Sequence, residues 1–153
     1  MWRSRIDRTP AGTIRLELSS DERALLRDVA DELRATLSDA PDDPSLRRLY
    51  PAAHEDEDLE RDFQELTRSQ LTSGRDRAAA TLRETADREL LSRDEADAWL
   101  RALNDARLVL GTRLEITEDF DWDSFDGTQP RAPELALYAY LSGIQEELVR
   151  AMA

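Results

Sequence analysis

The chain has 153 residues, of which 40% are apolar and 36% are charged, and its formal net charge is −13. Apart from one histidine, every basic residue is an arginine; the sequence contains no lysine, and this excludes Schiff-base chemistry. The absence of cysteine excludes disulfides, zinc–thiolate sites and thiol redox sensing within the chain. Because such a negative charge repels phosphate backbones, we expect no direct nucleic-acid binding.

The ends and the apolar runs of the sequence bear on its compartment. Residues 1–5 contain no apolar stretch of the signal-peptide type. The longest apolar run, residues 135–141, is too short for a bilayer, which needs about 20 residues. We therefore expect a cytoplasmic protein without membrane association. The length fits a single domain over residues 1–153, with a β-hairpin in residues 1–18 and a helical bundle in residues 20–153.

Alternation of apolar and polar residues predicts the N-terminal β-hairpin. Ile6 lies in the first alternating segment, and Ile14 and Leu16 lie in the second. The sequence Thr-Pro-Ala-Gly at residues 9–12 is typical of the turn between them. An isolated hairpin is marginally stable, so we expect this one to pack against helices.

Helical spacing of apolar residues continues along the chain. It predicts an amphipathic helix over residues 21–37 and a short helical turn over residues 46–50. The acidic residues 55–58 favour the positive end of a helix dipole, so we expect a long helix to begin there. Gly74 is interpreted as the end of that helix, and residues 78–90 as a third helix.

The clearest helix start is at Ser92, since Glu95 three residues later completes a capping box. The helix that follows reaches Leu114. Gly111 weakens it by about 1 kcal/mol relative to Ala, so we expect a close approach of another group there. Pro133 opens a last helix. The predicted fold is mainly α, with about five helices in a compact bundle and a short N-terminal β-hairpin.

The sequence shows no recognisable set of catalytic residues. His54 is the one histidine and lacks the second histidine of a zinc-protease helix, so we interpret it as a surface residue. The five glycines form no phosphate-binding motif. A pair of carboxylates acting as acid and base stays an alternative, although 34 acidic residues produce many chance pairs. We predict no catalytic residue, no cofactor and no metal.

Residues 115–132 form an acidic loop with three aromatic residues. Counted from Asp121, the spacing of a calcium loop fails, because Asp126 stands where Gly is required and Ala132 where Glu is required. Three interpretations stay open: a solvated loop whose aromatic rings pack back on the domain, a weak divalent-cation site, or a docking loop for a basic partner. The anchors of the docking loop would be Phe120, Trp122 and Phe125.

Polar residues interrupt the apolar face of the helix that begins after Ser92. They are Asn104, Asp105, Arg107 and Arg113. Residues three or four apart share a helix face, so Asp105 is expected to pair with Arg101. The polar group has two interpretations, a network that determines how this helix packs or a partner-binding face.

Residues 98–114, Ala-Trp-Leu-Arg-Ala-Leu-Asn-Asp-Ala-Arg-Leu-Val-Leu-Gly-Thr-Arg-Leu, resemble the central signature of an actinobacterial family of domains of unknown function. Some members of that family are oxidative-stress transcriptional regulators. Residues 43–52, 62–67 and 138–149 are similar to further parts of the family, so the resemblance covers nearly the whole chain.

The resemblance implies a small, non-enzymatic, cytoplasmic protein. Its regulator members imply action through an alternative sigma factor, with redox sensing by cysteines, and a thiol switch cannot be carried over to this cysteine-free chain. Genes of the family often lie beside that of the protease adaptor ClpS.

We therefore predict a non-enzymatic protein-interaction module, a transcription-linked regulator that presents an acidic surface to a partner such as a sigma factor or RNA polymerase. The alternative is an adaptor or accessory of ClpS-linked proteolysis, and the second alternative is a small carboxylate-based enzyme. A homodimer stays open. The predicted partner-binding residues are Asn104, Asp105, Arg107, Arg113, Phe120, Trp122 and Phe125.

Overall fold

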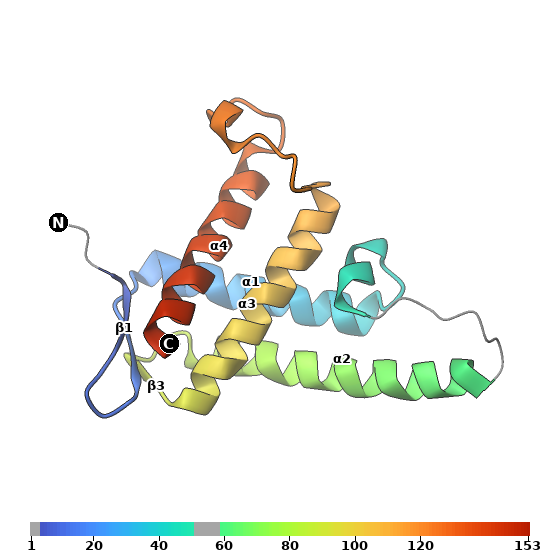
Figure 1. The fold of residues 1–153 in the computed structure, drawn as a ribbon, viewed down its shortest axis with the longest axis horizontal. Helices are drawn as coiled ribbons and strands as arrows, with labels where there is room; N and C mark the ends of the chain where they lie inside the picture. Colours follow the sequence, from blue (N-terminus) through green and yellow to red (C-terminus); the bar gives the residue numbers. More distant parts are fainter. Residues whose placement is uncertain (1–3, 51–58) are drawn as a thin grey trace.

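The protein forms a helical bundle with a small antiparallel sheet at one end, as shown by a computed structural model that describes residues 4–50 and 59–153 (Figure 1). In the second range, side chains are described from residue 65 onward. The interpretations of His54 and of a helix start in the acidic residues 55–58 lie outside the described residues.

The elements follow one another along the chain in a simple order. They are β1 (Ile6–Arg8), β2 (Ile14–Leu16), α1 (Ser20–Asp39), the 3₁₀ helix η1 (Pro44–Leu49), α2 (Leu59–Thr85), β3 (Leu90–Leu91), α3 (Arg93–Arg113), the 3₁₀ helix η2 (Trp122–Ser124) and α4 (Ala132–Met152). Within the described residues, five helices are longer than one turn, and the mainly-α prediction is confirmed.

The predicted hairpin is present and gains a third strand. Ile6 pairs with Leu16 across β1 and β2, and Gly12 in the turn has a φ of +88°, which suits glycine. Strand β3 pairs antiparallel with β2, with Leu91 opposite Ile14. The assignment of Leu90 to a helix is wrong, because α2 ends at Thr85 and a two-residue strand has too little periodicity to be recognised. Its alternation is visible in the structure, where Leu91 is buried and Leu90 is exposed.

Capping boxes begin both α1 and α3. The hydroxyl of Ser92 accepts from the backbone N–H of Glu95, and the Glu95 carboxylate accepts from the N–H of Ser92, which confirms the predicted start. Ser19 and Glu22 make the same reciprocal pair at α1. Two free backbone donors are satisfied at each helix start, so the positions of both starts follow from local sequence.

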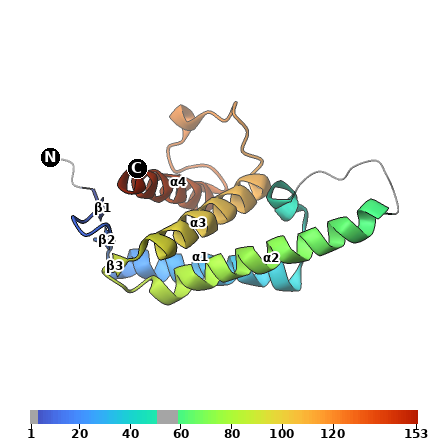
Figure 2. The same cartoon turned by 60° about the horizontal axis from the view of Figure 1, so that its bottom comes forward.

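The expected break at Gly74 is wrong, because α2 is one helix that continues through this residue. A glycine inside a helix costs about 1 kcal/mol, which packing can offset. The second half of α2 supplies that packing, since Ala78, Ala79 and Leu82 are buried and the helix contacts both α1 and α3. Its first turns extend beyond the other helices (Figures 1 and 2), and Leu66 is 59% exposed there.

Helix α3 lies at the centre of the bundle, in contact with α1, α2, α4 and η1. Trp99 and Leu103 are fully buried in its core-facing side. The indole N–H of Trp99 donates to the hydroxyl of Thr85, 2.6 Å away, and that hydroxyl donates to the carbonyl of Thr81. The only polar atom of the Trp99 side chain is therefore paired inside the core.

Replacing Thr85 with valine should lower the free energy of unfolding by about 1–3 kcal/mol, because the Trp99 N–H would stay buried without an acceptor. Urea unfolding followed by circular dichroism measures this change. The matched control is Thr81→Val on the same helix, where the lost hydroxyl donates to the backbone carbonyl of Arg77. Equal losses in the two variants would contradict a specific role for the Thr85 acceptor.

Candidate interaction surface

A buried ion pair joins the centre of α3 to α2. The Asp105 carboxylate is 1% exposed and lies 2.5 Å from the Arg75 guanidinium. Arg75 also donates to the backbone carbonyl of Leu49, the last residue of η1. A single guanidinium therefore connects α2, α3 and η1. Within the described residues the ion pair of Asp105 is with Arg75, whereas Arg101, one turn earlier on the same helix, is exposed and acts on the carboxylate through its charge alone.

Burial has the larger effect on the Asp105 carboxyl. It raises the pKa of Asp105 above the ordinary value, although the charges of Arg75 and Arg101 and the hydrogen bond from Arg75 act in the opposite direction. The second carboxylate oxygen is buried and has no hydrogen-bond partner among the described residues. The pair is thus an incompletely satisfied polar contact inside a helical core.

Asn104 and Arg107 face α4. The side-chain carbonyl of Asn104 accepts from Arg107 at 3.2 Å and from the amide of Gln145 at 3.4 Å. Gln145 lies on α4, so this group of side chains spans the contact between α3 and α4. Both Asn104 and Arg107 are half-buried.

Arg113 reaches a third neighbour, helix α1. Its guanidinium lies 3.3 Å from the carboxylate of Glu32 and 3.3 Å from the hydroxyl of Thr36. Three of the four polar residues predicted on this helix thus contact three different helices: Asp105 contacts α2, Asn104 contacts α4 and Arg113 contacts α1. Within the described residues, only Asn104 and Arg107 bond to each other. This geometry is that of a network which orients α3. A partner-binding role for the same residues stays a prediction.

The aromatic residues of the acidic loop do come together. Trp122 stacks on Tyr138 of α4, with ring centroids 5.8 Å apart and an interplanar angle of 13°. Phe120 and Phe125 contact Trp122 edge-on, at 4.7 and 6.1 Å between centroids. The loop is at the end of the α3–α4 pair remote from the sheet (Figure 1). We name the group of Phe120, Trp122, Phe125 and Tyr138 the aromatic platform.

Gly111 explains how the platform sits on α3. A Cβ atom at this position would lie 3.0 Å from the ring of Tyr138, closer than nearly all real contacts. The expected close approach at Gly111 is therefore confirmed, and the approaching group is the ring under Trp122. Of the interpretations of the loop, packing of its rings onto the domain is what the geometry shows, yet Trp122 keeps 38% of its surface exposed.

Hydrogen bonds within the loop hold its backbone in shape. The Asp121 carboxylate accepts from the N–H of Asp123, and the Asp126 carboxylate accepts from the backbone and hydroxyl of Thr128. Arg131 donates to the carbonyl of Arg113 and pairs with Glu134. Arg131 thus joins the end of the loop to both flanking helices, α3 and α4.

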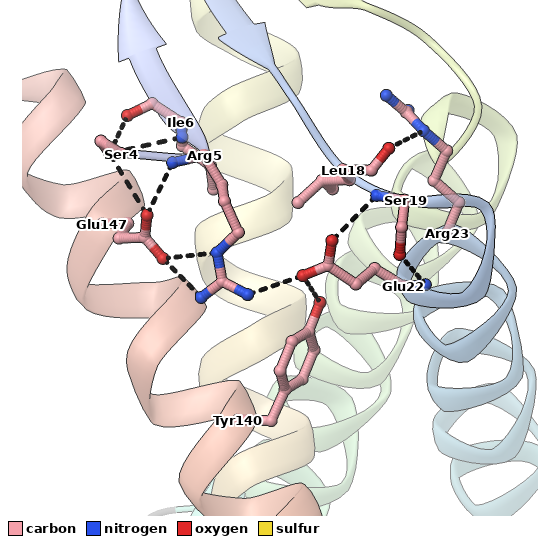
Figure 3. A network of polar contacts seen from close by, with 9 residues as sticks. All are labelled: Ser4, Arg5, Ile6, Leu18, Ser19, Glu22, Arg23, Tyr140 and Glu147. Carbon is pink, nitrogen blue, oxygen red and sulfur yellow. Dashed lines mark hydrogen bonds and ion pairs between the residues drawn. The ribbon is translucent and has the colours of Figure 1, made fainter. Parts of the chain in front are cut away.

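Sequence reasoning did not identify the polar network that ties the N-terminal segment to the bundle (Figure 3). The Arg5 guanidinium lies between Glu147 of α4, at 2.7 Å, and Glu22 of α1, at 2.6 Å. The Glu147 carboxylate also accepts from the backbone N–H of Arg5 and from the hydroxyl of Ser4. Glu147 is more than 100 positions from Ser4 and Arg5, so no local pattern signals its contacts.

Hydrogen bonds and the charge of Arg5 keep the two carboxylates of this network, Glu147 and Glu22, ionised. Burial raises the pKa of Glu147, but the hydrogen bonds and charge of Arg5 outweigh it and hold the pKa below the ordinary value. The pKa of Glu22 is lowered in the same way, with the N–H of Ser19 contributing. Burial and the adjacent Glu22 carboxylate raise the pKa of the Tyr140 hydroxyl, which donates to Glu22. The network is therefore charged and stable near neutral pH.

Two hollows of the bundle are candidates for ligand sites. A pocket of about 60 Å³ lies among α1, α3 and α4, well below the 300–1,000 Å³ typical of small-molecule sites. A larger, open hollow of about 680 Å³ between α1 and α2 has a mixed lining of charged, hydroxyl and apolar side chains, and its Arg34 and Asp76 pair with each other at 3.0 Å. The small pocket is mainly apolar, and the larger hollow presents charges of both signs.

The described part of the chain contains no group of three or more metal-ligating side chains and no helix suited by length and hydropathy to crossing a membrane. What the bundle does present is the aromatic platform, in which Trp122 is exposed, on a loop rich in exposed acidic residues. These features define the class of this protein as a small helical domain whose candidate site is an open surface.

Comparison with known proteins gives the family. The chain belongs to the domain-of-unknown-function family DUF2017, whose profile matches residues 2–152. It is 27% identical over 188 residues to the oxidative stress regulator AosR of Mycobacterium tuberculosis, an alignment that covers 97% of this chain and 85% of the relative. The AosR of Mycobacterium bovis aligns with the same figures. A relative in Mycobacterium leprae, also named for AosR, is 29% identical over 143 residues, or 82% of this chain and 65% of the relative. No solved structure matches the chain.

Replacing Glu147 with glutamine should lower the free energy of unfolding near neutral pH by about 1–3 kcal/mol, because its charge-assisted bonds to Arg5 weaken. The folded pKa of Glu147 lies below its unfolded value, so its stabilisation is present above about pH 4.5 and is lost as the pH falls through the folded pKa. Urea titrations near neutral pH and near pH 4 should therefore show a smaller acid-induced loss in the variant. Glu146→Gln is the control, since this exposed neighbour pairs with Arg150 on the helix surface. Identical behaviour of the two variants would refute the assignment.

Replacing Arg75 with methionine should lower the free energy of unfolding near neutral pH by about 3 kcal/mol, because Asp105 would stay buried without its cation. The folded pKa of Asp105 is already raised, and loss of Arg75 raises it further. Protonation then relieves the buried charge, so the deficit should shrink as the pH falls through that raised pKa. Thermal unfolding across pH measures it, with the exposed Arg77→Met as control. A deficit that does not change with pH would argue against a buried carboxylate as its cause.

Proposed function

We propose that this chain is a non-enzymatic regulator of the oxidative-stress type that acts by binding a protein partner, such as a sigma factor or another component of RNA polymerase. The observation that carries the proposal is the extent of the similarity to the mycobacterial regulators. It reaches across 97% of this chain, so it includes the whole bundle and is not confined to one motif. The regulator name belongs to those relatives, and its extension to this chain is the proposal.

The charge of the chain supports a protein as the binding partner. A net charge of −13 favours attraction to basic protein surfaces and disfavours approach to nucleic acid. The described hollows do not suit a small-molecule substrate, and the candidate site is an exposed surface. Because the chain has no cysteine, the proposal contains no thiol switch.

Affinity capture tests this function. The full chain is immobilised and exposed to a native lysate of its own organism at low and high salt, and bound proteins are quantified by mass spectrometry. The control bait is an unrelated protein of similar size and net charge, which measures capture by charge alone. We expect a sigma factor or an RNA polymerase subunit to be enriched over the control, with recovery that falls at high salt.

Two results would contradict the proposal. One is recovery of no transcription component above the control bait. The other is selective recovery of ClpS and its protease, which would favour the alternative role in regulated proteolysis. The proposed partner should also bind as a purified protein, measured by calorimetry, since indirect capture through a third protein would not establish contact.

A further inference from the structure

The aromatic platform presents a large ring that is both exposed and held in place. Tyr138 stacks against Trp122, and Phe120 and Phe125 contact it edge-on. Even so, 38% of the Trp122 surface remains exposed. A tryptophan held rigidly by three other rings loses little conformational entropy on binding, which is a property of interface anchors.

Acidic residues flank these rings along the loop. Residues 115–130 contain six acids and no basic residue. Three of the acids, Glu118, Asp119 and Asp123, are exposed, and their side chains make no hydrogen bond or ion pair with the described residues. The two arginines that flank this segment are already occupied. Arg131 pairs with Glu134 and donates to the carbonyl of Arg113, and the Arg113 guanidinium contacts Glu32 and Thr36. The loop therefore offers negative charge that the fold itself does not use.

The chain shows elsewhere what a ring beside carboxylates accommodates. The Arg5 guanidinium lies 5.6 Å from the centroid of the Tyr140 ring and pairs with Glu22 and Glu147 (Figure 3). The Arg75 guanidinium lies 5.8 Å from the centroid of the Tyr50 ring and pairs with Asp105. In both places an arginine contacts a ring face and a carboxylate at once. The platform supplies the ring and the carboxylates of such a site at the surface.

We propose that the aromatic platform binds arginine side chains of a basic segment in a partner protein. The guanidinium stacks on Trp122 and pairs with the carboxylates of Glu118, Asp119 and Asp123. Arginine is preferred to lysine because its planar, weakly hydrated cation can stack and form ion pairs together. This inference rests on the proposed function in one respect: it names the surface and the chemistry by which a regulator partner is held.

Peptide binding to the full chain tests the site, with fluorescein-labelled octa-arginine as the probe and fluorescence anisotropy as the readout. Trp122→Ala should weaken binding about fivefold, the loss expected for a solvent-accessible cation–π contact. The combined variant Glu118→Gln, Asp119→Asn, Asp123→Asn should weaken it about tenfold at low salt. The affinity for labelled octa-lysine should fall by less than about twofold in the Trp122→Ala variant, because an ammonium group does not stack on the ring as a guanidinium does.

A matched variant separates this site from general attraction to an acidic protein. Asp28→Asn, Glu84→Gln and Asp97→Asn together remove the same number of charges from exposed positions on α1, α2 and α3. We expect this control variant to bind octa-arginine within about twofold of the wild type. The proposal would be overturned if the control variant lost as much affinity for octa-arginine as the combined Glu118→Gln, Asp119→Asn, Asp123→Asn variant. It would also be overturned if Trp122→Ala lost no affinity. Circular dichroism and the fluorescence of the buried Trp99 verify that each variant is folded.

The same variants used as baits keep this inference distinct from the proposed function. If the wild-type chain captures a sigma factor or polymerase subunit, and the Trp122→Ala and loop variants capture it equally well, the docking site is wrong and the function stands. If octa-arginine binds as described but no transcription component is captured, the function is wrong and the arginine site stands.

Discussion

Helix α3 is the constraint on which the rest of the structure depends, because every other main helix packs against it. On its apolar face, Trp99 and Leu103 are fully buried. Its polar residues contact different helices. Asp105 pairs with α2, Asn104 contacts α4, and Arg113 contacts α1. Apolar burial is non-directional, whereas these polar contacts have defined geometry, so together they determine both that the bundle forms and how its helices are oriented.

That arrangement leaves the two ends of the bundle with different characters. At one end, Arg5 ties the N-terminal segment to α1 and α4 by ion pairs that are partly shielded from solvent. At the other end, the connection between α3 and α4 exposes Trp122 and its surrounding acids. The same combination of arginine, ring and carboxylate that closes the first end is incomplete at the second. A surface of that kind is suited to an external cation, and this links the fold to the proposed regulator role.

The mycobacterial relatives carry the name oxidative stress regulator AosR, and a regulator role for this chain is the proposal made above. The chain lacks cysteine, so the proposed regulator role contains no thiol switch. The charged surface favours fast, salt-sensitive encounters with basic proteins. The buried Asp105–Arg75 pair is better understood as part of the architecture that holds the surface in position than as a contact for the partner.

Local sequence by itself determined the helical class, the capping boxes at Ser19 and Ser92 and the hairpin. Each depends on residues a few positions apart, where backbone geometry and spacing are decisive. Tertiary structure alone decided the continuation of α2 through Gly74, the short strand β3, the partner of Asp105 and the network around Glu147. These depend on groups brought together from distant parts of the chain, and the free energy of that packing exceeds the local preference of any single residue.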